Sequence, residues 1–145
     1  MDIHEQTEVR HSVQEAIALF QEAGKEEALA RIGDRNGPFT KDTHYIFALD
    51  LDGNLLAHPY LKDRVGQSLA ELKDSEGRAF IRLLVNVAKR RGHGYTYYNW
   101  IAQGSQEELK KTTFFQRVGD VILCSGFYSP KEDPIARFSL QEAVV

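Results

Sequence analysis

Three consecutive segments decide the fold, and they read GYTYYNWI (Gly94–Ile101), KKTTFFQRV (Lys110–Val118) and VILCSGFY (Val121–Tyr128). Each is rich in the aromatic and β-branched residues that favour β-strands. Only Gly119-Asp120 separates the last two, which is typical of a hairpin turn. Parallel neighbours would need a crossover connection of a dozen or more residues, usually a helix. The short links therefore predict an antiparallel sheet.

Two further elements precede these strands. His44–Asp50 and Leu55–His58 are apolar and aromatic segments on either side of an Asp-Gly-Asn turn, and this pattern predicts a β-hairpin. Apolar residues at spacings of three and four then predict a helix over 75–91, with Ser75 as its N-cap and Gly92 just beyond its end. Both elements fit a sheet that has helices packed on it.

The N-terminal part of the chain is expected to be helical. From about Glu5 to Ile32 apolar side chains recur every three or four residues with charged residues between them, which predicts an amphipathic helix. Gly24 interrupts the pattern, so one kinked helix and two separate helices fit it equally well. Gly33–Pro38 reads as a loop, and the tail around Pro130 and Pro134 is expected to end in looser residues.

The order of the elements predicts the α+β fold class. Helix, hairpin, helix and three strands follow one another, whereas a doubly wound parallel sheet needs a helix between its strands. The chain has 145 residues, the length of one ordinary domain, and it needs no disulfide or metal to build a core. We therefore expect a single domain over residues 1–145, with its core from about 5 to 129.

Composition and charge exclude several classes of partner. The 18 basic and 21 acidic residues give a net charge of −3, with no basic excess to bind phosphate backbones, so no nucleic-acid partner is expected. The longest apolar runs are far shorter than the roughly 20 residues that cross a bilayer. The start Met1–Glu5 lacks the basic and apolar regions of a signal peptide, which leaves the compartment open.

No catalytic or metal motif stands out. The sequence lacks the GxSxG, P-loop, GxGxxG and HExxH patterns, and no metal-ligand spacing of histidine or cysteine occurs. Asp50 and Asp52 resemble an aspartate nucleophile or a calcium loop only superficially, because the chain runs from Gly53 directly into a strand, so we interpret them as turn residues. The single cysteine, Cys124, lies in an apolar run and is interpreted as buried filler.

A polar and aromatic cluster on the strands is the most informative feature. Strand alternation places Tyr98 and Trp100 on one face of their strand, and it places Lys111 and Thr113 together on one face of the next. Lys111 has two interpretations that the pattern leaves open. It is either an edge residue whose ammonium reaches solvent, or a cationic anchor in an aromatic-lined pocket that meets a ligand carboxylate.

His58 presents a similar choice. Because it precedes Pro59, its backbone is held extended at the end of a strand. Its side chain either hydrogen-bonds a turn or donates into the cavity, and the spacing favours neither.

Several short segments, spread over about residues 20–128, also stand in a recognisable order. They are Gly37-Pro38-Phe39, Tyr45-Ile46-Phe47, Asp52-Gly53, Ala57-His58-Pro59, Val65-Gly66, Gly92 to Gly94 with Tyr98 and Trp100, Lys111, and Ser125 to Tyr128. In this order they resemble the type 2 single Cache domain family, which are small-molecule sensor modules of bacteria with a PAS-like fold. The resemblance implies a central antiparallel sheet of about five strands, a long N-terminal helix, a helix packed on the sheet, and a pocket on the sheet.

The resemblance also implies a function. Family members typically bind small organic acids without a cofactor and pass a signal to an output domain, and a periplasmic location follows from the family, although the sequence does not exclude the cytoplasm. Carried over by position, the ligand contacts would be the carboxylate anchor Lys111, the wall residues Tyr98 and Trp100, the sheet residues Tyr45 and Phe47, and the polar contacts His58 and Thr113.

Two alternatives to a sensor remain open. The amphipathic N-terminal helix suggests a structural module that forms a homodimer through this helix. An enzyme would use His58 and Tyr98 as acid and base, which rests only on two titratable side chains that could face one cavity. We expect a sensor that is not an enzyme and that binds a small carboxylate.

Overall fold

The computed structural model describes residues 3–131, and within them the α+β prediction is confirmed. In chain order the elements are α1 (Ile3–Ala23), α2 (Lys25–Ile32), β1 (Ile46–Asp50), β2 (Leu55–Ala57), the short 3₁₀ helix η1 (Lys62–Arg64), α3 (Phe80–Arg91), β3 (His93–Ile101), β4 (Glu108–Val118) and β5 (Val121–Ser129). The looser tail predicted around Pro134 lies outside the described residues.

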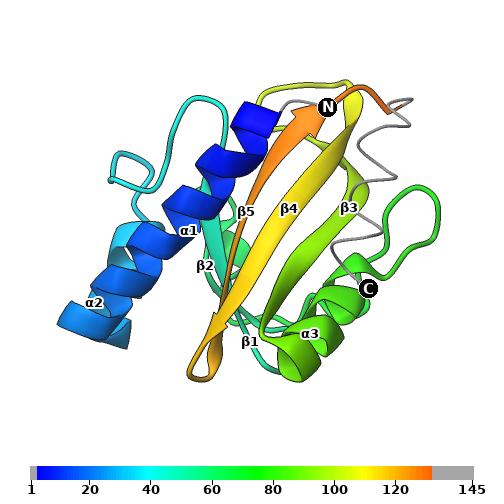
Figure 1. Ribbon diagram of the computed structural model, residues 1–145. Coiled ribbons are helices and arrows are strands. Elements are labelled where there is room, and N and C mark those ends of the chain that lie inside the picture. Colours follow the sequence, from blue (N-terminus) through cyan, green and yellow to red (C-terminus); the bar gives the residue numbers. More distant parts are fainter. Residues whose placement is uncertain (1–2, 132–145) are drawn as a thin grey trace.

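The five strands form one antiparallel sheet in the order β2-β1-β5-β4-β3. The three C-terminal strands pair as successive hairpins, and β5 also pairs with β1, so the first hairpin joins the sheet through the last strand (Figure 1). In this register Lys111 lies opposite Tyr98 on one side and Tyr128 on the other. β4 is thus an interior strand, and Lys111 sits near the middle of the sheet.

The N-terminal segment forms two helices, which settles the choice that the sequence left open. Gly24 separates them with a φ of 94°, a left-handed conformation that favours glycine. α1 lies across one face of the sheet (Figure 1), where Val9, Val13 and Ala16 are fully buried against β4 and β5. No helix within residues 3–131 is long and apolar enough to cross a membrane.

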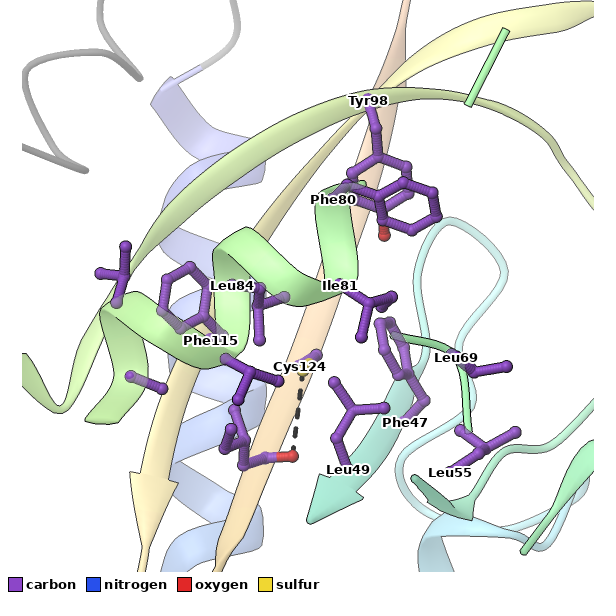
Figure 2. Close-up of a cluster of buried hydrophobic side chains, with 14 of the residues drawn as sticks. Phe47, Leu49, Leu55, Leu69, Phe80, Ile81, Leu84, Tyr98, Phe115 and Cys124 are labelled. Atoms are coloured by element: carbon purple, nitrogen blue, oxygen red, sulfur yellow. Dashed lines mark hydrogen bonds between the residues drawn. The ribbon is translucent and has the colours of Figure 1, made fainter. Parts of the chain in front are cut away.

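α3 packs on the opposite face and builds a second core. Its apolar side chains meet those of β1, β3 and β5, and Figure 2 shows Ile81 and Leu84 pointing toward Phe47 and Cys124. Cys124 is completely buried, as the sequence predicts, and burial raises the pKa of its thiol. The segment between β2 and α3 also lies on this face, which makes it the face of the cavity described below.

The predicted start of this helix is wrong. α3 begins at Phe80 rather than near Ser75, and Ala79 precedes it without a side-chain cap. The Asp74 carboxylate accepts hydrogen bonds from the backbone N–H groups of Glu76 and Arg78. These bonds hold residues 74–78 in a non-helical turn. The predicted end is confirmed, since Gly92 follows Arg91 with a φ of 88°.

Candidate functional site

A cavity lies between the sheet and the segment that joins β2 to α3. Six of the seven side chains that the sequence singled out line it: Tyr45, Phe47, His58, Tyr98, Trp100 and Lys111. Thr113 does not line it, but its hydroxyl lies 2.9 Å from the Tyr98 hydroxyl and hydrogen-bonds it from behind. The structure therefore brings the predicted residues together, with Thr113 as a support for Tyr98.

Lys111 is a buried cation. Its side chain is 2% exposed, and its Nζ donates a hydrogen bond of 3.0 Å to the Tyr45 hydroxyl. The rings of Tyr45, Phe47 and Tyr128 surround the ammonium at 4.4, 5.3 and 5.5 Å from Nζ to each ring centroid. The interpretation as a solvent-reaching edge residue is therefore wrong, because Lys111 lies on an interior strand with its Nζ among aromatic rings.

No acidic side chain compensates this charge within residues 3–131, where the Lys111 ammonium has no carboxylate partner. Burial lowers the pKa of Lys111, because the interior disfavours the charged form. A buried charge without a counter-ion costs several kcal/mol, and the surrounding rings recover only part of it. An anion beside Lys111 would therefore stabilise the charged form of its side chain.

Tyr45 and His58 lie next to the ammonium. Burial raises the pKa of Tyr45 to about 12, so its hydroxyl keeps its proton at neutral pH while its oxygen accepts from Lys111. His58 Nδ1 accepts the backbone N–H groups of Tyr60 and Leu61, at 3.0 Å each. A neutral imidazole then carries its proton on Nε2. His58 therefore hydrogen-bonds a turn, which is one of the two roles that the sequence left open, and its ring also lines the cavity.

The same surroundings keep the imidazole neutral. Burial, together with the nearby charge of Lys111, lowers the pKa of His58 to about 3. At neutral pH the ring is therefore a donor without charge. A ring with so low a pKa is a poor general acid or base at neutral pH.

Packed aromatic rings form one wall of the cavity. Tyr98 from β3 stacks on Phe80 from α3 with ring centroids 3.9 Å apart and planes 13° apart, and Figure 2 shows the two rings overlapping. Trp100 meets Phe80 edge to face at 5.6 Å. Such contacts add to the burial energy of the rings and fix their positions. In this conformation the cavity is tight, about 20 Å³, which is room for about one water molecule.

Two residues at the site were missed by the sequence analysis. The Tyr128 hydroxyl is buried beside Lys111 and Tyr45, without hydrogen-bond geometry to any residue in the described range. Its place follows from the pairing of β4 with β5, a register that a single sequence does not reveal. Arg64 lines the cavity from η1, in a segment that has no periodicity to assign it to a face.

Comparison with known proteins identifies a family and a relative of this chain. The family model described as Single Cache domain 2 matches residues 3–129. The methyl-accepting chemotaxis protein McpP of Pseudomonas putida is 28% identical over 128 residues, which cover 87% of this chain and 23% of that protein. The chain thus spans less than a quarter of this curated relative.

Solved structures are similar over most of the chain. One, described as the structural basis for carboxylic acid recognition by a Cache chemosensory domain, has a TM-score of 0.73 and 28% identity, and covers 86% of this chain and 93% of its own. A methyl-accepting chemotaxis protein from Vibrio parahaemolyticus has a TM-score of 0.72 at 20% identity, covering 85% and 87%. A periplasmic sensor domain of a chemotaxis protein has a TM-score of 0.66 at 22% identity, covering 84% and 88%. The last two support the fold alone.

Proposed function

The chain belongs to the single Cache domain 2 family, and from this premise we propose that it is a sensor domain that binds a small organic carboxylate against Lys111. The observation that carries the proposal is the buried ammonium of Lys111, which has no carboxylate partner among residues 3–131. The similar Cache structure that is described by its recognition of carboxylic acids supports the same ligand class.

Each polar group at the inner end of the cavity has a role in this proposal. The ligand carboxylate accepts a charge-assisted hydrogen bond from Lys111 Nζ, which compensates the buried charge. The Tyr45 hydroxyl and His58 Nε2–H donate to the remaining lone pairs of the carboxylate and set its orientation. Phe47, Tyr98 and Trp100 exclude water and take up the apolar part of the ligand. The chemistry is recognition, and no bond of the ligand is broken.

Signalling and location remain proposals for this chain. Because the chain matches 23% of a methyl-accepting chemotaxis protein, we propose that it is the ligand-binding part of a signalling system, and the family resemblance favours the periplasmic side of the membrane. Its single domain would cover residues 1–145. A homodimer through α1 stays a prediction, and the buried stripe of α1 packs on the chain's own sheet, so a second copy would meet the other side of the helix.

The anchor is tested by Lys111→Met, which removes the charge and keeps most of the stem. Calorimetry with acetate and propionate should show affinity reduced by at least about tenfold, because the anion loses the buried ammonium with which it pairs. Trp100, the chain's single tryptophan, lines the cavity and gives a second readout by fluorescence.

The matched control is Lys89→Met, which removes the same charge from an exposed position on α3. It should leave the affinity within about twofold of the unaltered protein. Unchanged binding in Lys111→Met, or equal losses in the two variants, would contradict the anchor role.

A further inference from the structure

A second cation faces the same cavity from its other side. Arg64 is half-buried and lines the cavity from η1, whereas Lys111 lines it from the sheet. Within residues 3–131 the Arg64 guanidinium has no ion pair with Asp63 or any other carboxylate, and none of the described side chains that line the cavity is acidic. The cavity is therefore lined by two cationic side chains and by no side chain of opposite charge.

Much of the remaining lining of the cavity is apolar. Leu61, Leu69 and Leu72 line it on the side of the connecting segment, and Phe80 and Ile81 line it on the side of α3. A ligand with one carboxylate at Lys111 would leave the Arg64 guanidinium against this apolar wall without an anion. A ligand with a carboxylate at each end would meet both cations and place its short carbon chain between them.

We propose that Arg64 is a specificity-determining residue, and that it makes the site prefer a short dicarboxylate over a monocarboxylate of the same chain length. The guanidinium fits this role because its planar pairs of N–H groups bind a carboxylate in a bidentate way. The inference rests on the proposed function, since it assumes that the first carboxylate binds at Lys111.

The cavity must widen for such a ligand, and the wall that carries Arg64 is the one able to move. η1 contains no buried residue, and Leu61 and Leu72 on either side of it are only half-buried. The opposite wall is the sheet itself, where Lys111 and Tyr98 are almost completely buried. An outward shift of η1 costs few buried contacts and takes Arg64 with it, so the guanidinium stays at the outer end of the ligand.

Succinate and butyrate form the matched pair of probes, because both have four carbons and differ in the second carboxylate. In calorimetry the unaltered protein should bind succinate at least about tenfold more tightly than butyrate. Arg64→Gln should bring the two affinities to within about twofold of each other, with butyrate affinity nearly unchanged. Lys62→Gln removes the same charge from an exposed position of η1 outside the cavity, and it should preserve the preference.

Three results overturn the role of Arg64 while they leave the carboxylate sensor intact. They are tighter binding of butyrate than of succinate, equal weakening of both acids by Arg64→Gln, and an equal effect of Lys62→Gln. Failure of the unaltered protein to bind succinate, butyrate, acetate or propionate would instead contradict the proposed function, and the role of Arg64 with it. Loss of all carboxylate binding in Lys111→Met, together with weaker binding of succinate but not of butyrate in Arg64→Gln, supports both the proposed function and the role of Arg64.

Discussion

His58 shows how one side chain serves both the backbone and the cavity. Its Nδ1 accepts two backbone N–H groups just before η1, so the imidazole fixes the start of the segment that closes over the site. Accepting these hydrogen bonds requires the neutral ring, because a protonated imidazole has no free lone pair on Nδ1. The same protonation state leaves Nε2–H as a donor, so the local fold and the recognition of an anion depend on one proton.

The stability of the protein should therefore depend on pH through His58. Its pKa is about 3 in the folded protein, against an ordinary value of about 6.5 in the unfolded chain. Below pH 6.5 His58 is protonated in the unfolded chain but not in the folded protein. The free energy of unfolding therefore decreases as the pH falls toward 3. The loss from this group amounts to about 1.4 kcal/mol per pH unit over that window.

Urea unfolding at pH 7, 6, 5 and 4 measures this dependence. His58→Asn is the informative variant, since an Asn carbonyl can accept a nearby backbone N–H without titrating. The difference in unfolding free energy between the two proteins should shrink or reverse as the pH falls. A parallel pH dependence in both proteins would show that His58 is not the group responsible.

At the residue scale the sequence predicts the cavity side chains better than their partners. Alternation along each strand places Tyr98 with Trp100 and Lys111 with Thr113, because a strand has a strict period of two, whereas the pairing of the two strands brings Tyr98 and Lys111 to the same side. The burial of Lys111 could not be predicted, since it depends on β4 lying between β3 and β5. Arg64 escapes prediction for another reason, because it lies in an irregular segment whose direction is set only by tertiary contacts.

At the scale of elements, the close packing of β5 on β4 sets the position of the ammonium. Gly126 lies opposite Thr113 in the register, and a Cβ at Gly126 would come within 2.8 Å of Lys111 Cε and 2.6 Å of Thr113 Oγ1. Real Cβ atoms do not come that close to other heavy atoms. The absence of a side chain at Gly126 therefore provides the space that the Lys111 side chain occupies. A strand glycine often marks such a close approach.

Gly126→Ala should therefore damage the site and the fold together. We expect a loss of about 1–3 kcal/mol in unfolding free energy from overpacking, and weaker carboxylate binding because the Lys111 side chain is displaced. Ser125→Ala on the same strand is the control, since the Ser125 hydroxyl is buried without a partner in the described range and its removal should be nearly neutral. Equal stability and affinity in the two variants would contradict this account of β5.

The stacking of α3 on β3 is a second link between elements. Phe80 is 3% exposed and packs on both Tyr98 and Trp100, so Phe80→Ala leaves a cavity beside the ligand site. The expected cost is about 3–5 kcal/mol of unfolding free energy, measured by urea denaturation. Leu83→Ala, on the exposed side of the same helix, should cost less than about 1 kcal/mol. Similar losses in both variants would mean that Phe80 does not anchor α3.

Elements were predicted well where periodicity is strong. The three C-terminal strands and the break at Gly24 agree with the sequence pattern to within one or two residues, because strand alternation and a helix-breaking glycine are local signals. The start of α3 was misplaced, since Asp74 competes for the backbone N–H groups that a helix would begin with. Ser75 has the side chain of a helix cap, but its hydroxyl donates to Glu108 on β4 instead.

At the scale of the whole molecule, the site exists because two distant parts of the chain meet. β1 and the residue before it bring Phe47 and Tyr45, and β4 brings Lys111. Their contact depends on β5 lying between the two strands. The order of elements predicts the α+β class, but it does not say that the last strand joins the first hairpin, since non-local pairing leaves no local signal. The charged centre of the site is therefore a property of the complete sheet.

The central claim is that the buried ammonium of Lys111 pairs with the carboxylate of a ligand. NMR titration of the Lys111 Nζ resonance tests it most directly, without ligand and with saturating carboxylate, because a paired anion stabilises the charged form. In the ligand-free protein burial holds the pKa of Lys111 below its ordinary value. We predict that the bound carboxylate raises this pKa, and that raising the pH through it weakens binding. A Lys111 pKa that stays the same when the carboxylate is bound would contradict the account.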